Sequence, residues 1–161
     1  MKEIKDAQKK WRVAKAKVQA DCEKSGRLEL AKRLADCKMF TGEESLSEMV
    51  DLMFSPQGVE FLTRSGFPDI QTFRKFKKYK PESLGVWIDS GEVTLTDNKR
   101  VFLVGDTTAK VMYNESQGNR LVLMHGAKAT VEASGWSVVK IEKDGKSAVT
   151  VKSSGHAKVL Q

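Results

Sequence analysis

The densest group of chemically active side chains lies at residues 74–80, with the sequence Arg-Lys-Phe-Lys-Lys-Tyr-Lys. Cations neutralise nucleic-acid phosphates and aromatic rings stack on exposed bases, so this basic segment predicts a nucleic-acid contact. The residues expected to make it are Arg74, Lys75, Lys77, Lys78, Tyr79 and Lys80. The alternative is structural, because Phe76 shares an apolar helical face with Ile70 and Phe73, and lysines are favoured at a helix C-terminus.

The formal net charge of +7 is unevenly distributed along the chain. Residues 1–80 hold 18 Lys and Arg against 12 Asp and Glu, whereas residues 81–161 hold 10 against 9. Any attraction to a polyanion is therefore expected to come from the N-terminal half.

The two histidines, His125 and His156, are the candidates for acid–base chemistry. Acyltransferases built from stacked coils work with a single general-base histidine, which makes an acyltransferase-like β-helix enzyme one hypothesis. Each histidine adjoins a glycine near an expected bend, where a surface imidazole is common, and the six-residue aliphatic-glycine repeat of those enzymes is missing. The segment Asp144-Gly-Lys-Ser147 resembles the end of a phosphate-binding loop, but Lys140 occupies the position of its first glycine. The sequence therefore favours a protein that is not an enzyme.

The two cysteines, Cys22 and Cys37, lie far in sequence from both histidines. Reduced, packed thiols are the simplest interpretation, and the sequence predicts neither a metal site nor a cofactor. The charged N-terminus has no apolar signal region, and no apolar run is long enough for a membrane span. The expectation is a cytoplasmic protein that has no contact with a membrane.

The elements that must position these residues differ between the two halves of the chain. Residues 4, 7, 11, 14, 18 and 22 are apolar and fall on one helical stripe that ends near Gly26, and residues 28–35 predict a second helix of the same hairpin. Overlapping capping boxes at 41–48, Ser55-Pro56 and Pro68-Asp69 predict three further helices. Nearly all of residues 1–79 should be helical.

The C-terminal half alternates with period two and contains regularly spaced glycines. Gly126, Gly135, Gly145 and Gly155 lie roughly ten residues apart, which is typical of repeated strand-and-turn units. A coil of roughly 20 residues predicts a small β-solenoid, whereas the hairpin-like Asp144-Gly145 leaves an antiparallel β-meander or barrel as the alternative. The residues expected inside a solenoid are Ala129, Val131, Val139, Ile141, Val149, Val151, Ala157 and Val159.

The order of segments resembles a family of proteins from gut bacteria and their phages or mobile elements. The resemblance lies in Phe54-Ser-Pro-Gln-Gly-Val-Glu-Phe61, Gly66-Phe-Pro68, Val101-Phe-Leu-Val-Gly105 and Leu123-Met-His-Gly126. It spans residues 50–161 and implies an accessory or structural role in a mobile element. These are packing and turn motifs and the family has no assigned activity, so no functional residue is implied.

The sequence as a whole predicts an α+β protein with a helical domain at 1–80 and a β-solenoid-like domain at 81–161. The favoured function is a non-enzymatic interaction or structural module. An open solenoid end invites a protein partner or self-association, and the residues expected to contribute are Trp136, on a corner, and Leu160, near the last strand. Trp87 is expected to point outward if its neighbours Val86 and Ile88 point inward.

Overall fold

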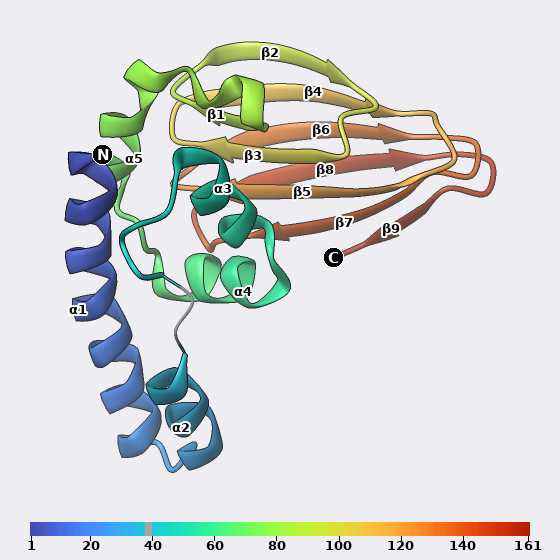
Figure 1. Cartoon of the computed structure of the whole chain (residues 1–161). Helices are drawn as coiled ribbons and strands as arrows, with labels where there is room; N and C mark the ends of the chain where they lie inside the picture. The colour runs from blue at the N-terminus through green and yellow to red at the C-terminus, as the bar shows by residue number, and fades with distance from the viewer. Residues whose placement is uncertain (38–39) are drawn as a thin grey trace. The chain divides into compact units, whose positions relative to one another are not determined.

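The computed structural model describes residues 1–37 and 40–161. It divides into two compact units, Met1–Pro68 and Asp69–Gln161. The first unit is helical, and the second has a short helical segment followed by a two-sheet β-solenoid (Figure 1). The fold is therefore α+β, as the sequence predicts. The domain boundary expected after residue 80 marks the change from helix to strand, whereas the compact units divide before the last helix.

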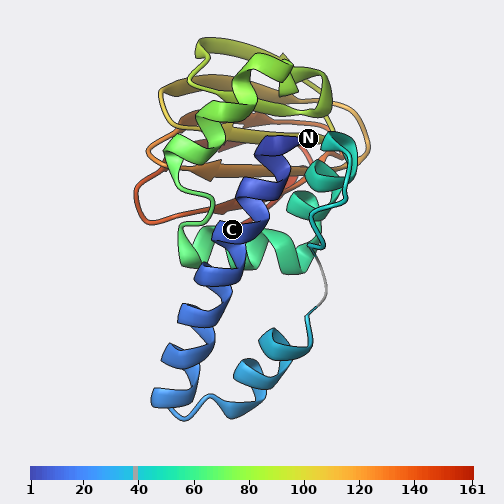
Figure 2. The same ribbon diagram turned by 60° about the vertical axis from the view of Figure 1, so that its left-hand side comes forward.

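The first unit contains helices α1 (Lys2–Lys24), α2 (Leu28–Asp36), α3 (Leu46–Phe54) and α4 (Pro56–Ser65). The apolar stripe of α1 is confirmed, since Ile4, Ala7, Trp11 and Cys22 are all buried. Helix α2 runs beside the C-terminal half of α1, which forms the predicted hairpin (Figures 1 and 2).

Short polar residues fix where α3 and α4 begin. Ser45 and Glu48 form the predicted capping box, in which the Ser45 amide donates to the Glu48 carboxylate at 2.8 Å. Ser55 serves both helices, because its hydroxyl donates to the Leu52 carbonyl at 2.7 Å and accepts from the Gly58 amide at 3.0 Å.

The second unit opens with α5 (Ile70–Phe76) and the 3-10 turns η1 (Lys77–Tyr79) and η2 (Pro81–Leu84). One sheet contains β1 (Val86–Ile88), β3 (Arg100–Val104), β5 (Gly118–Met124), β7 (Val138–Lys143) and β9 (Lys158–Leu160). The other contains β2 (Gly91–Thr96), β4 (Thr107–Tyr113), β6 (Lys128–Ala133) and β8 (Ala148–Ser153).

Every strand pair is parallel, so the structure is a solenoid and not an antiparallel meander. Consecutive strands alternate between the two sheets, and the strands stack from β2 to β9 (Figure 1). From β3 onward the register partners lie 20 residues apart, as with Val101, Leu121 and Ile141. The predicted length of one coil is confirmed.

A single apolar core fills the space between the two sheets. All eight residues predicted to point inward belong to it, either as buried members or as partly buried side chains packed against it. Trp87 also packs against this core, in register with Leu103, so the prediction that it points outward is wrong. Its neighbours Val86 and Ile88 are buried on the opposite face of β1.

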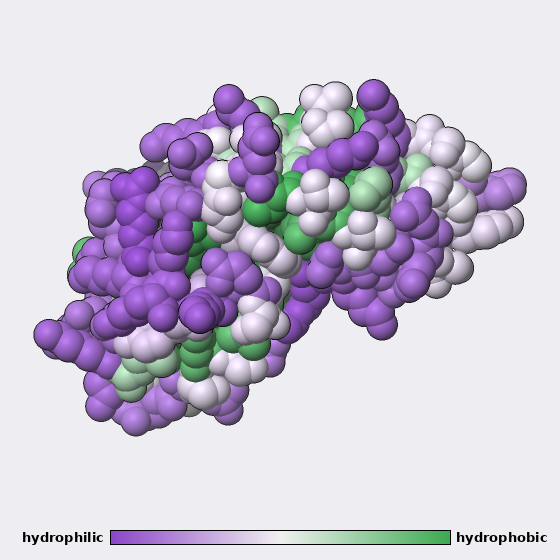
Figure 3. Space-filling view, turned by 90° about the horizontal axis from the view of Figure 1, so that it is seen from above, coloured by the Kyte–Doolittle hydropathy of each residue, from purple (hydrophilic) through white to green (hydrophobic). Residues whose placement is uncertain are grey.

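Helix α5 covers part of the outer face of the β1-containing sheet. The Phe73 ring lies 6.0 Å from the ring of Phe102, a buried outward residue of β3. The corners of the coils are held by aspartates that accept backbone N–H groups, as Asp97 does from Asn114 at 2.6 Å. Seen from above, the surface is mainly hydrophilic, with hydrophobic side chains in limited areas (Figure 3).

Candidate protein-interaction site

In the part of the chain that the structure describes, the strands β8 and β9 each have a neighbouring strand on one side. Within the described chain, β8 pairs only with β6 and β9 pairs only with β7. Ala148 and Ser154 donate their N–H groups to carbonyls of the β6 segment, at 3.1 and 2.9 Å. Because alternate residues of a parallel strand bond to opposite neighbours, the intervening odd-numbered residues turn their backbone groups to the open side. These residues are Val149, Val151 and Ser153.

The apolar core continues to this edge and becomes partly exposed there. Val131 and Val139 are completely buried one coil earlier. In contrast, the corresponding inward residues of the last coil are only half-buried. They are Val149, Val151, Ala157 and Val159. We name this surface the terminal edge and define it as β8, the corner 154–157 and β9.

An aromatic pair stands at one corner of the terminal edge. The rings of Trp136 and His156 stack at 4.0 Å between centroids with an interplanar angle of 14°. The corner repeats because Gly135 and Gly155 both have positive φ, 61° and 64°, and the His156 amide donates to the Gly135 carbonyl at 2.8 Å. Trp136 is 65% exposed, as predicted. His156 belongs to the later coil, so the second face of its ring points toward the open side.

Leu160 lies on the same end of the solenoid but not beside Trp136. It is 53% exposed and in register with Lys140 of β7. Trp136 lies in the turn before β7, whereas Lys140 is the third residue of that strand. The structure therefore places both predicted interaction residues on the final coils, at separate points.

The terminal edge is also basic. Residues 145–161 include Lys146, Lys152 and Lys158 and contain no Asp or Glu. Lys152 and Lys158 are exposed residues of the edge strands themselves.

The basic segment at 74–80 is partly used by the fold. Arg74 bridges Asp89 at 2.6 Å, and this hydrogen bond lowers the pKa of Asp89. The Lys77 ammonium donates to the Asp89 carbonyl at 2.7 Å. Both cations thus hold the corner between β1 and β2. Tyr79 is half-buried beneath the Lys78 ammonium, which lies 5.0 Å from the ring centroid.

The two histidines occupy opposite corners of the coils and do not share a site. His125 lies between β5 and β6, edge-on to Phe73 at 5.7 Å, and its amide donates to Asp144 at 2.7 Å. His156 lies between β8 and β9. Across residues 1–37 and 40–161, no three His, Cys, Asp or Glu side chains gather as a metal site requires.

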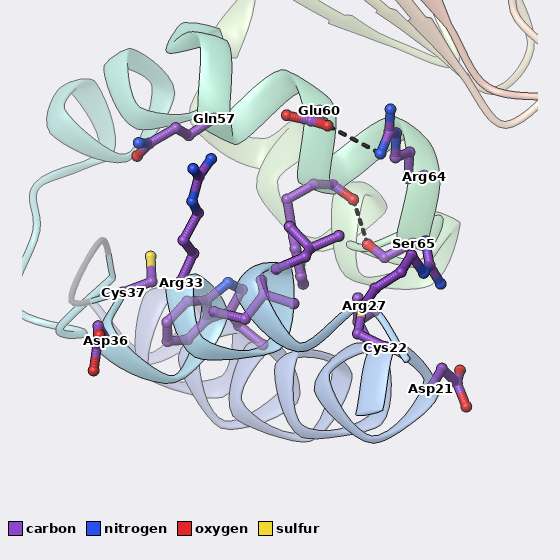
Figure 4. A pocket seen from close by; sticks show the side chains of 15 residues that line it. Asp21, Cys22, Arg27, Arg33, Asp36, Cys37, Gln57, Glu60, Arg64 and Ser65 are labelled. Atoms are coloured by element: carbon purple, nitrogen blue, oxygen red, sulfur yellow. Dashed lines mark hydrogen bonds and ion pairs between the residues drawn. The ribbon is translucent and has the colours of Figure 1, made fainter. Parts of the chain in front are cut away.

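The helical unit contains a groove that the sequence did not predict. It has a volume of about 800 Å³ and lies between the α1–α2 hairpin and α4 (Figure 4). Side chains such as Leu34 and Phe61 give it an apolar floor, and Arg27, Arg33 and Arg64 stand at its margin among carboxylates. The free thiols of Cys22 and Cys37 also line it. Helix periodicity gives the faces of single helices but not the distance between them, which explains why this groove was missed.

Comparison with protein-family models, with curated proteins and with solved structures finds no match for this chain. The resemblance to proteins of gut bacteria and mobile elements therefore stays a prediction. In the described residues, no helix combines the length and the apolar character that crossing a bilayer requires.

Proposed function

We propose that the protein is a non-enzymatic interaction module that binds a protein partner through the terminal edge. The observation that carries this proposal is the row of backbone groups on β8 that have no strand beside them within the described chain. Such a row accepts an added strand by main-chain hydrogen bonds, while pockets for alternate side chains supply specificity. The half-exposed valines of the last coil are these alternate positions.

The rest of the solenoid supports this role by keeping the edge rigid. Each strand of the last coil is hydrogen-bonded to the coil before it, and the inner side chains pack against residues that are completely buried. A preorganised edge loses little conformational entropy when a partner binds.

Photo-crosslinking from two register-matched positions tests this function. Thr150 and Thr130 are register partners on the same outer face, and both are exposed, but Thr150 lies on the edge strand and Thr130 on an internal strand. A photoreactive phenylalanine at Thr150 is expected to give a covalent protein adduct in cells, and the same residue at Thr130 is not.

A second variant shows whether the adduct depends on strand addition. Val151→Pro removes one N–H from the open side and leaves the hydrogen bonds to β6 in place, since proline is tolerated on the free side of an edge strand. We expect the Thr150 adduct to disappear in this variant. Equal labelling from Thr150 and Thr130, or labelling that Val151→Pro leaves unchanged, would overturn the proposed function.

A further inference from the structure

We infer that the partner strand is acidic: an extended segment of another protein that alternates apolar and acidic residues and adds to the terminal edge. This inference rests on the proposed function and specifies the chemistry of its partner. It depends on how the solenoid pairs charges between successive coils, and on the charge that remains at its last coil.

Two ion pairs on the outer faces follow the same diagonal rule. Lys110 on β4 lies 3.4 Å from Glu132 on β6, and Arg120 on β5 lies 3.8 Å from Glu142 on β7. In both pairs the acid is 22 residues after the base, which is one coil of 20 residues plus two positions along the next strand. Glu142 also meets Lys140 of its own strand at 3.2 Å. In these two pairs a base on one strand is offset by an acid two positions along the next strand, whereas the corresponding positions for Arg100 and Lys128 hold Val122 and Thr150.

On their open side, Lys152 and Lys158 have no strand beside them in the described chain; on the other side Lys152 lies in register with Glu132, which already pairs with Lys110. An added strand that repeats the arrangement of these two pairs would place an acid opposite Leu160 for Lys158 of β9. It would place an acid opposite Ser154 for Lys152 of β8. The partner would also place apolar side chains over Val149 and Val151, which continue the inner core.

The same charges argue against a second copy of this chain as the occupant. Two terminal edges that met face to face would bring Lys152 and Lys158 of both copies together, with no acid in either edge. Lysines on edge strands commonly oppose pairing between identical chains. The edge is therefore disfavoured for its own copy and suited to an acidic strand.

Head-to-tail stacking of copies fails for a different reason. The register of this sheet can be followed from its last strand, β9, back to its first strand, β1. Along this path Lys158–Leu160 align with residues 82–84, which precede β1. Those residues belong to the 3-10 turn η2, which packs on β1. β9 would meet a helical turn there, and only one of the two sheets could continue.

The test uses the full chain and two short synthetic peptides, one alternating valine with glutamate and the other alternating valine with lysine. We expect the glutamate peptide to shift the amide resonances of Val149, Val151 and Val159 on titration. Several exposed ion pairs separate the two peptides, so the lysine peptide should bind about tenfold more weakly. In the double variant Lys152→Glu/Lys158→Glu the preference should reverse. Both lysines are exposed, so this variant is expected to fold.

The outcomes separate this inference from the proposed function. One outcome is that the Thr150 adduct forms but the chain binds the glutamate peptide no more tightly than the lysine peptide; another is that the adduct forms but the double variant still binds the glutamate peptide more tightly. In either case the edge binds a strand, but the inference that this strand is acidic is refuted. If light scattering shows that the chain dimerises and Val151→Pro abolishes the dimer, the occupant is a second copy and the inference is overturned. Resonance shifts confined to residues 74–80 would equally overturn it.

Discussion

The hydroxyl of Tyr113 offers a sharp test of the solenoid core. Tyr113 ends β4, is completely buried in the inner core and lies opposite Ala133 of β6. No protein group among the described residues makes a hydrogen bond with its hydroxyl oxygen. Burial raises the pKa of this hydroxyl, which therefore stays protonated and neutral. Leaving such a group without a partner costs about 1–3 kcal/mol.

Tyr113→Phe keeps the ring and removes the hydroxyl. Taking the lower part of that range, we expect the free energy of unfolding to rise by about 1 kcal/mol, since the small space left by the oxygen offsets part of the gain. For a protein of this size, that corresponds to an increase in Tm of about 2–4 °C.

The assay must report on the solenoid and not on the helical unit. Native-state hydrogen exchange of the β4 and β6 amides measures the opening free energy of this region directly. Tyr113→Ala is the control, and the loss of the ring should cost about 3–5 kcal/mol. If Tyr113→Phe lowers protection of these amides, the hydroxyl has a hydrogen-bond partner in solution and the reasoning is refuted.

Three further predictions concern the corners and the basic segment. Burial alone would raise the pKa of Asp144, but hydrogen bonds from the N–H groups of His125, Lys146 and Ser147 outweigh it, so the pKa is lowered. The stability that this carboxylate contributes is therefore present above the unfolded-state pKa of about 4, and it is lost as the pH falls through the folded-state pKa. Asp144→Asn should therefore lower Tm at pH 7 and have progressively less effect below about pH 4; a pH-independent difference would contradict this. Gly105→Ala should lower the free energy of unfolding in urea by about 1–3 kcal/mol, because the φ of Gly105 is +67° and the new methyl group would contact Asp89 and Ile70. Gly145→Ala is the control and should change this free energy little, because a methyl group there meets nothing within 4 Å. For the nucleic-acid prediction, oligonucleotide affinity should fall as salt is raised and fall further in Lys75→Glu/Lys78→Glu/Lys80→Glu, and an affinity that ignores salt would refute it.

The solenoid could be predicted because its later coils obey simple rules. In β6 and β7 the inward side chains are aliphatic and most outward ones are charged or polar, so the period of two identifies the core face without ambiguity. The spacing of the corner glycines then gives the coil length, and parallel stacking follows when each coil lies over the one before.

The early strands do not obey these rules, and this explains the wrong prediction for Trp87. Phe102, Val104, Val122 and Met124 point away from the inner core, yet all are completely buried. With apolar residues on both faces of a strand, alternation cannot tell which face is the interior. Trp87 lies inside and its two aliphatic neighbours outside because a second apolar layer, to which Phe73 of α5 contributes, covers the outer face of this sheet.

The sequence predicted the open solenoid end and two exposed side chains of the interaction site, but not how charges pair between its coils. Trp136 breaks the local pattern as a large aromatic residue at a turn, and Leu160 as an aliphatic one at an outward position, so composition and periodicity point to both. The diagonal pairing of Lys110 with Glu132 is different, because an offset of 22 residues has no meaning until the coil length and register are known. With those in hand the same offset gives the positions at which an added strand could place an acid for Lys152 and Lys158. The charge of the partner is thus a consequence of the register, and a change in coil length at the terminal edge would alter which partner residue must be acidic.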